Sequence, residues 1–488
     1  MKKILHRPLA LLLAGAALFT YTALPAAAAW DFSPSGSAIV RTAPALTVTG
    51  GTAGTDYTYQ NGLLTVNSGN LTIQGTGTAA SAAILVKAGY TGTLTLDSVA
   101  LQNTAGPALT VEPTAAATLT LVGDNTLQGS DHFAGILVPQ DAALTVTGTG
   151  TLTATGGTDG AGIGGCAGEN TVCSFAFPTA NPGSITLQSG TITAQGGTGA
   201  ADIGGSSAAT APGTFSTGTD GSAVLYAETI SDLSGQDAWN GLWVQANQAT
   251  VYGSLTLAGD LTLDAATPLK LSEGTTLTVP QGLCLLTGAL QNAGTIAVAQ
   301  DAALSADTLD NAGTLENAGT LALAVVCNSG TLKNIGQMTV ANGKLDNDGI
   351  LQNDGTLGFY TAPVHNTGDL ENDGTLELND STLQNDDDDA LGGTGTVILA
   401  WGGSLKGLEP LDLSIEYRIY FDVQADGVAT PESAVTEDGC LPALPAATRT
   451  GYTLDGWFTD PEDGTPVTEQ TPLTESVMLY ALSLIHIS

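Results

Sequence analysis

An acid-rich run is the part of the sequence best suited to holding a metal ion. Four consecutive aspartates occupy 386–389, and further aspartates fall at neighbouring turns. Carboxylate oxygens are the ligands that Ca²⁺ prefers. No D-x-D-x-D-G loop is complete, however, and charge also serves to blunt exposed strand edges. The run is therefore a candidate calcium site, with a solvated acidic edge as the alternative; its residues are Asp386, Asp387, Asp388 and Asp389.

Two tryptophans form the best candidate for contact with a sugar ring. Trp239 and Trp243 lie four residues apart in a segment without repeats, a spacing compatible with one face of a strand. Their rings offer an aromatic platform for a glycan. Packing between two repetitive segments is the alternative, because tryptophan is usually largely buried.

Five cysteines cannot all pair with one another within one chain. Cys166 and Cys173 are seven residues apart in one loop and are the best candidates for a disulfide. Cys284 and Cys327 lie in apolar strand patterns, so we expect buried thiols there.

Catalytic chemistry has little support. A lyase for acidic sugars needs clustered basic residues, and those between 30 and 412 are dispersed. A glycosidase needs two facing carboxylates. Asp159 and Asp202 flank two glycine-rich blocks and could share a face, although such turn residues are commonly just solvated. His132 and His365 are isolated, and no cofactor is predicted.

The amino-terminal segment predicts export. Lys2, Lys3 and Arg7 precede an apolar run, which ends in small residues at Ala29. This order is typical of a signal peptide, and no later segment reaches the ~20 apolar residues of a membrane-spanning helix. The chain has 11 basic and 47 acidic residues, and loss of the signal peptide brings the net charge from −36 to −39. Such a charge disfavours nucleic acid as a partner.

Repeats indicate the architecture that must position these residues. Thr151–Gly165 matches Thr191–Gly205 at an offset of 40, with alternating strand patterns before them. Further along, Asn-x-Gly motifs come in pairs six residues apart, and the pairs step by 17, 19 and 19 residues. These steps are too short for a propeller blade. We predict a right-handed parallel β-helix in which like residues stack; the stacked sets are Asn311, Asn328, Asn347 and Asn366, and Leu315, Leu332, Leu351 and Leu370.

The pattern changes from Tyr417 onward. The stretch Arg449–Asp460 (RTGYTLDGWFTD) resembles the signature of internalin B-type repeats of the Listeria-Bacteroides family, and the resemblance covers about 417–481. It implies a small β-grasp-like module that decorates bacterial surface proteins. The glycine-rich body, with Gly123–Leu127 (GDNTL), resembles β-helical surface proteins of gut Firmicutes, some of which are described as carbohydrate-binding.

These observations divide the chain and bound its function. We expect a signal peptide at 1–29, β-helices at 30–225 and 251–412 with a break at 226–250, the repeat module at 413–481, and an adapter-derived addition at 482–488. The expected protein is extracellular or at the cell surface, binds a glycan or a surface protein of a host or bacterium, and is not an enzyme. A β-helical carbohydrate-active enzyme and a passive stalk are the alternatives.

Overall fold

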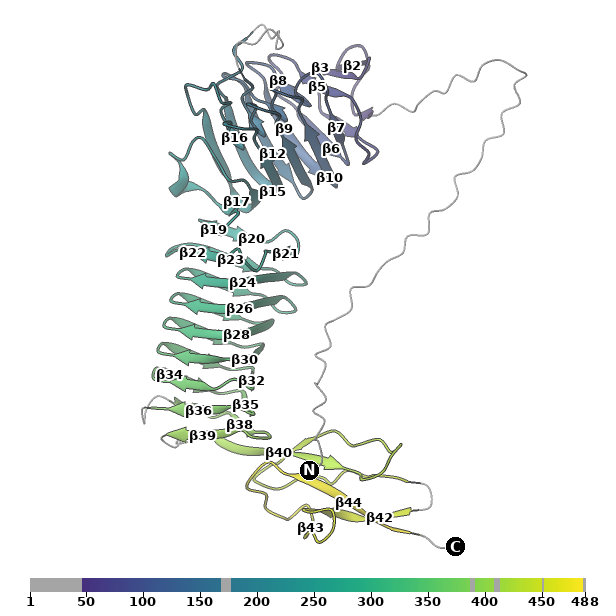
Figure 1. Ribbon diagram of the computed structural model, residues 1–488, viewed down its shortest axis with the longest axis vertical. Helices are drawn as coiled ribbons and strands as arrows, with labels where there is room; N and C mark the ends of the chain where they lie inside the picture. Colours follow the sequence, from purple (N-terminus) through teal and green to yellow (C-terminus); the bar gives the residue numbers. More distant parts are fainter. Residues whose placement is uncertain (1–45, 168–176, 387–390, 408–412, 450–451, 486–488) are drawn as a thin grey trace, which may run out of the picture. The chain divides into compact units, whose positions relative to one another are not determined.

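The computed structural model describes residues 46–167, 177–386, 391–407, 413–449 and 452–485. These residues are built almost entirely of β-strands, which wind into parallel β-helices, as predicted (Figure 1). The described part contains a single 3-10 turn, η1 (Gln236–Ala238), and no α-helix.

The first β-helix is formed by a seven-stranded sheet and by part of a large second sheet. The strands of the seven-stranded sheet are β2 (Tyr57–Gln60), β3 (Leu63–Val66), β5 (Ala83–Val86), β8 (Leu109–Val111), β11 (Ile136–Leu137), β14 (Ile163–Gly164) and β16 (Ile203–Gly204). The large sheet begins with β1 (Thr47–Thr49), β4 (Leu71–Gln74), β6 (Thr93–Asp97), β7 (Ala100–Gln102), β9 (Ala116–Val122), β10 (Asp124–Gln128), β12 (Ala143–Gly148), β13 (Thr151–Thr155), β15 (Ser184–Gln195), β17 (Thr214–Tyr226), β18 (Gly241–Gln245) and β19 (Gln248–Tyr252).

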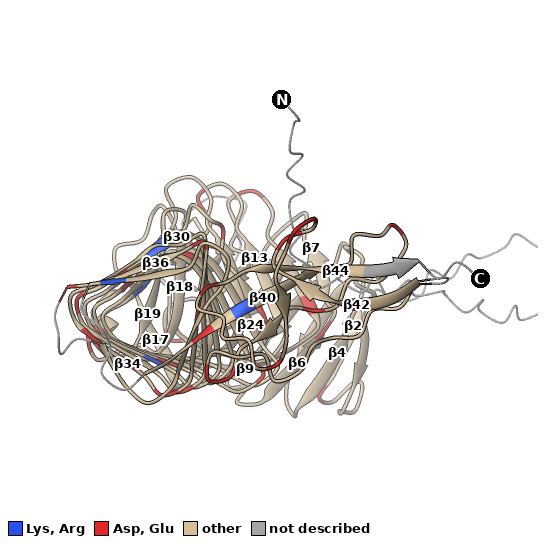
Figure 2. Cartoon of the chain, turned by 90° about the horizontal axis from the view of Figure 1, so that it is seen from below, with Lys and Arg blue, Asp and Glu red and all other residues tan. Residues whose placement is uncertain are grey.

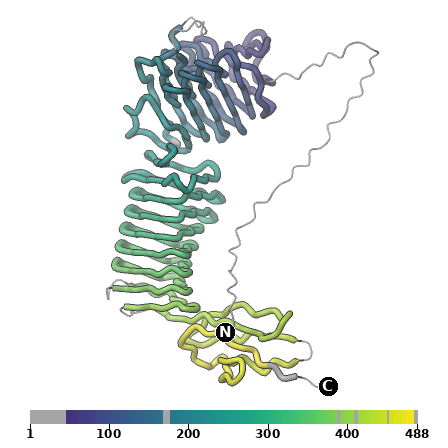
Figure 3. The backbone as a smooth tube through the Cα atoms, viewed as in Figure 1, coloured from purple at the N-terminus to yellow at the C-terminus, as the bar shows by residue number. Residues whose placement is uncertain are grey.

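The second β-helix has narrower coils, which follow one another regularly along the chain (Figure 3). Its eight-stranded sheet comprises β20 (Ser254–Thr256), β23 (Thr276–Val279), β25 (Thr295–Val298), β27 (Thr314–Asn317), β29 (Thr331–Asn334), β31 (Ile350–Asn353), β34 (Asp369–Asn372) and β37 (Leu391–Gly392). The large sheet continues with β21 (Leu261–Thr262), β22 (Leu269–Leu271), β24 (Cys284–Asn292), β26 (Ala303–Asn311), β28 (Thr320–Asn328), β30 (Gln337–Asn347), β32 (Thr356–Tyr360), β33 (Val364–Asn366), β35 (Thr375–Asn379), β36 (Thr382–Asn385), β38 (Thr396–Leu399) and β39 (Ser404–Gly407).

Stacked apolar side chains form the core of each β-helix. The two copies of the 40-residue repeat pair in register, with Thr151 opposite Thr191 and Ile163 opposite Ile203. In the second β-helix, Leu315, Leu332, Leu351 and Leu370 stack on one another and are almost fully buried, as predicted. Alternation along each strand places every second side chain inside, so the coil needs only one row of leucines from each strand.

Buried asparagines run beside the leucines as two continuous ladders. In the first ladder each Nδ2 donates to the Oδ1 of the next coil at 2.6 to 2.7 Å, through Asn292, Asn311, Asn328, Asn347, Asn366 and Asn385. The second ladder has bonds of 2.6 to 2.8 Å through Asn317, Asn334, Asn353 and Asn372. Most of these amides also donate to a backbone carbonyl, for example Asn311 to that of Thr331 at 3.0 Å. The predicted stack of four asparagines is confirmed, and the observed ladder extends it by one asparagine at each end, Asn292 and Asn385.

In the Asn-x-Gly motifs a glycine lies two residues after the asparagine, because neighbouring coils approach closely at this corner. A Cβ at Gly330 would lie 2.1 Å from the carbonyl oxygen of Gly313, and one at Gly349 would lie 2.3 Å from that of Gly330. No larger residue fits unless the backbone shifts. The Asn-x-Gly motif thus combines an inward amide with a turn that only glycine can make this tight.

A small module with its own core follows the second β-helix. It comprises β40 (Ser414–Asp422), β41 (Ala434–Val435), β42 (Tyr452–Phe458), β43 (Pro466–Val467) and β44 (Met478–Ile485). Trp457 is buried beside Phe421, with ring centroids 4.8 Å apart. Residues 482–485, which the sequence predicted to be an addition, continue β44 and pair with β42.

Candidate functional site

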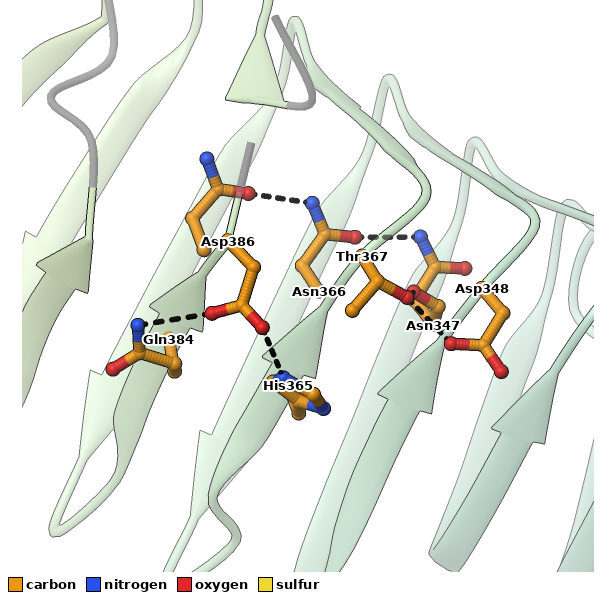
Figure 4. A network of polar contacts seen from close by, with 8 residues as sticks. Asn347, Asp348, His365, Asn366, Thr367, Gln384 and Asp386 are labelled. Atoms are coloured by element: carbon orange, nitrogen blue, oxygen red, sulfur yellow. Dashed lines mark hydrogen bonds and ion pairs between the residues drawn. The ribbon is translucent and has the colours of Figure 1, made fainter. Parts of the chain in front are cut away.

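The acid-rich run is only partly within the described residues, because 387–390 lie outside them. Asp386 accepts hydrogen bonds from Gln384 at 3.1 Å and contacts His365 Nε2 at 2.7 Å (Figure 4). The bond to His365 lowers the pKa of Asp386 below its ordinary value. His365 is therefore not isolated. Within the described residues no group of three or more metal-binding side chains comes together, and the calcium site stays a prediction.

Trp239 and Trp243 are buried, with exposed fractions of 4% and 8%. Their rings pack edge to face with centroids 5.9 Å apart, and Trp239 also contacts Phe215 and Tyr252. Trp243 Nε1 donates to the carbonyl oxygen of Ala227 at 2.7 Å. Neither ring offers an open face to a sugar, so the packing alternative is the correct interpretation of this pair.

The exposure of two cysteines differs from the prediction. Cys166 is buried, and Cys173 lies outside the described residues, so their disulfide stays a prediction. The expectation of buried thiols at Cys284 and Cys327 is wrong, because both are exposed and unpaired. Cys327 lies between Val326 and Asn328, which both point inward, so strand alternation turns the thiol outward.

The two carboxylates considered for a glycosidase have separate structural partners. Asp202 is buried, and its oxygens accept the backbone N–H groups of Gly196, Glu228 and Thr229 at 2.6 to 3.0 Å. Asp159 lies 3.2 Å from Nδ1 of His132, so this histidine is not isolated either. The structure thus gives Asp202 the role of fixing turns of neighbouring coils.

An open groove lies where the first β-helix gives way to the second. It has a volume of about 620 Å³. Parallel pairing aligns Thr193 of β15 with Tyr226 of β17, and Tyr226 with Val244 of β18, so the ends of three successive strands form one wall. Further lining comes from the turns that follow these strands and from Thr262, Leu263, Asp264 and Thr267, at the end of β21 and just after it. We call this the junction groove, and its polar and aromatic lining includes Gln195, Asp202, Tyr226, Glu228, Gln245 and Asp264.

The junction groove is acidic and rich in hydrogen-bonding groups. Glu228 and Asp264 each use one oxygen to accept a backbone N–H, from Ala246 at 2.6 Å and Ala266 at 2.9 Å, so the other oxygen can accept from a ligand. Burial raises the pKa of Tyr226 above its ordinary value, which keeps its hydroxyl a neutral donor. Among the residues that the structure describes, no Lys or Arg lines the groove. The lining suits a neutral ligand with many hydroxyl groups.

The rest of the described surface is also more acidic than basic. Asp and Glu lie mainly in the turns of the coils, whereas Lys and Arg are few (Figure 2). Sequence reasoning missed the groove because Gln195, Glu228 and Gln245 lie at spacings that match neither repeat family. Only the register of β15, β17 and β18 brings them together.

Comparison with known proteins supports the module. Residues 417–482 match the model of the Listeria-Bacteroides repeat domain, a repeat typical of surface or extracellular proteins. No curated protein and no solved structure matches the chain. Among the described residues no helix is long and apolar enough to cross a membrane.

Proposed function

We propose that this protein is an extracellular, cell-surface binding protein that holds a neutral glycan in the junction groove. The lining of that groove carries the proposal: two carboxylates with an oxygen to spare, two glutamine amides and one half-buried tyrosine line about 620 Å³. Sugar hydroxyls both donate and accept, so such mixed groups can bond to them. The described lining holds no Lys or Arg, which disfavours acidic sugars.

The proposed protein binds the glycan and does not cleave it. Hydrolysis of a glycosidic bond requires two carboxyl groups, one to protonate the leaving oxygen and one to act as base or nucleophile. Asp202 has both oxygens occupied by backbone donors. Glu228 and Asp264 each hold a backbone N–H with one oxygen, and the proposal assigns their second oxygens to sugar hydroxyls and not to acid–base chemistry. The Listeria-Bacteroides repeat, which is typical of surface or extracellular proteins, supports a location at the cell surface, where an adhesin would use the groove.

A glycan array tests the proposal with the full chain and a variant of the groove. Gln195→Ala together with Gln245→Ala removes two amides from the lining, and Gln337→Ala removes an exposed amide elsewhere as a control. We expect binding to at least one neutral glycan, about tenfold or more weaker in the double variant and unchanged in the control. Binding to acidic glycans only, or a double variant that binds like the wild type, would overturn the proposal.

A further inference from the structure

Three aromatic side chains gather where the outer face of the second β-helix meets β40. Trp401 is 57% exposed and Tyr360 is 39% exposed, which places both among the most exposed large apolar side chains described. Tyr420 is partly exposed, and its ring centroid lies 6.5 Å from that of Trp401 with an interplanar angle of 75°. We call Tyr360, Trp401 and Tyr420 the aromatic face.

Strand register brings these residues together from three coils. Tyr360 ends β32 opposite Asn379 of β35. In the next coil the carbonyl oxygen of Trp401 accepts the N–H of Asp380 at 2.7 Å, so Trp401 stacks beside the corner that follows Asn379. Strand β40 pairs with β38 as far as Tyr417 and then continues to Tyr420.

The ring of Tyr360 lies against the backbone of its own strand at Gly358. A Cβ at Gly358 would lie 2.7 Å from a ring carbon of Tyr360, so the tyrosine ring covers the glycine backbone. Any side chain at 358 would have to displace the ring. Glu377 lies directly opposite Gly358 on β35, which puts a carboxylate next to the covered glycine.

A neutralised ion pair lies among the aromatic rings. Arg418 donates from Nε and Nη2 to the two oxygens of Glu377 at 2.8 and 2.6 Å, and from Nη1 to Ser433 at 3.2 Å. The two side chains are 22% and 12% exposed. This bidentate pair cancels its own charge while still presenting polar groups in a fixed orientation.

We propose that the aromatic face is a second carbohydrate-binding surface, which stacks the apolar face of a neutral sugar ring on Trp401, with Tyr420 as a wall beside it, and bonds the sugar's hydroxyls through the remaining N–H groups of Arg418. Aromatic rings with a polar rim suit a ligand that is apolar on one face and hydroxylated at its edge. This surface shares no residue with the junction groove.

Charge decides between this ligand and the other classes. The chain carries a net charge of −36, which repels polyanions. Exposed tryptophan and tyrosine attract cations, but the Glu377 carboxylate is already neutralised by Arg418 and adds no attraction for one. A neutral saccharide satisfies both restrictions, and a second copy of this equally acidic chain does not.

Affinity electrophoresis of the full chain tests the proposal, with gels that contain a soluble neutral polysaccharide (a β-glucan, a galactomannan or starch). Trp401→Ala removes the most exposed ring, and Trp401→Phe restores an aromatic surface. Ile335→Ala is the matched control, because Ile335 is a comparably exposed apolar side chain at 54% in the same β-helix. Unchanged unfolding midpoints establish that each variant is folded.

We expect at least one polysaccharide to retard the wild type, with an affinity about tenfold weaker in Trp401→Ala and nearly restored in Trp401→Phe. Ile335→Ala should behave as the wild type. The proposal is wrong if Trp401→Ala is retarded as strongly as Ile335→Ala. It is also wrong if Trp401→Ala only converts a dimer into a monomer in sedimentation. The Gln195→Ala, Gln245→Ala double variant, assayed in the same gels, separates the two sites. Loss of retardation in the double variant shows binding in the junction groove, and loss of retardation in Trp401→Ala shows binding at the aromatic face.

Discussion

Asn317 lies opposite Val298 of the preceding coil, and its buried Oδ1 has no hydrogen-bond donor in the described part of the chain. Every later member of this ladder receives a bond from the asparagine before it, as Asn334 does from Asn317 at 2.8 Å. The ladder therefore begins with one unsatisfied oxygen. The other ladder avoids this at Asn292, whose Oδ1 accepts the N–H of Gly294 at 3.1 Å.

The first prediction compares the end of the ladder with its middle. Asn353→Leu should destabilise the protein by about 1 to 3 kcal/mol, because it leaves the buried Oδ1 of Asn372 without a donor. Asn317→Leu moves the unsatisfied oxygen from Asn317 to Asn334 without adding one. Both variants also lose an equivalent bond to a backbone carbonyl, of Gln337 and of Thr375, so Asn317→Leu should be the less destabilising of the two. Chemical denaturation of both variants measures the difference. Equal losses would show that the amides contribute by shape and not by hydrogen bonding.

A second matched pair tests the aromatic cluster. Trp243→Phe removes the bond from Nε1 to Ala227, whereas Trp239→Phe removes a buried N–H that has no acceptor among the described residues. Both substitutions delete similar apolar volume. We expect Trp243→Phe to be the more destabilising by about 1 kcal/mol, measured by urea unfolding. A larger loss for Trp239→Phe would contradict this assignment.

Close approach of the coils gives a third prediction. Gly330→Ala should destabilise the second β-helix by about 1 to 3 kcal/mol, because the new Cβ would meet the carbonyl oxygen of Gly313. Gly259→Ala is the control, since nothing lies within 4 Å of a Cβ there. Thermal unfolding of the two variants should separate them clearly. Similar midpoints would mean that the coils move apart easily.

Alkaline pH should weaken the first β-helix through Tyr90. This side chain is 2% exposed, and its hydroxyl donates to the carbonyl oxygen of Gly69 at 2.8 Å. Burial raises the pKa of Tyr90 to about 12. The unfolded tyrosine ionises near pH 10, so the stabilisation by Tyr90 is complete below pH 10 and is lost as the pH rises toward 12.

Unfolding free energies of the wild type and Tyr90→Phe should therefore converge between pH 10 and 12. The same comparison at pH 7 to 9 is the control and should show a constant difference. A difference that stays constant up to pH 12 would contradict the assignment of this titration to Tyr90.

Periodicity explains how much of the fold could be predicted. The regular Asn-x-Gly spacing fixed the stack of Asn311, Asn328 and Asn347, because one coil places like residues on like. Cys327 was misassigned because the inward direction of Asn328 was not used to set the alternation of the strand.

The candidate sites could not be predicted in the same way. The junction groove arises where coils of different width meet, and Tyr226 reaches Thr193 only through a pairing that contains a register shift. Trp401 and Tyr420 are separated in sequence by the start of the repeat module, although they face each other in space. Neither arrangement has a repeat spacing from which to predict it.

Analysis of a retained glycan after prolonged incubation tests the central claim most directly. The full chain is mixed with a neutral polysaccharide that it binds, and the saccharides are then examined by mass spectrometry and size-exclusion chromatography. A binding protein should leave the polysaccharide at its original length while the complex persists. Release of shorter saccharides, or failure to retain any neutral polysaccharide, would contradict the account.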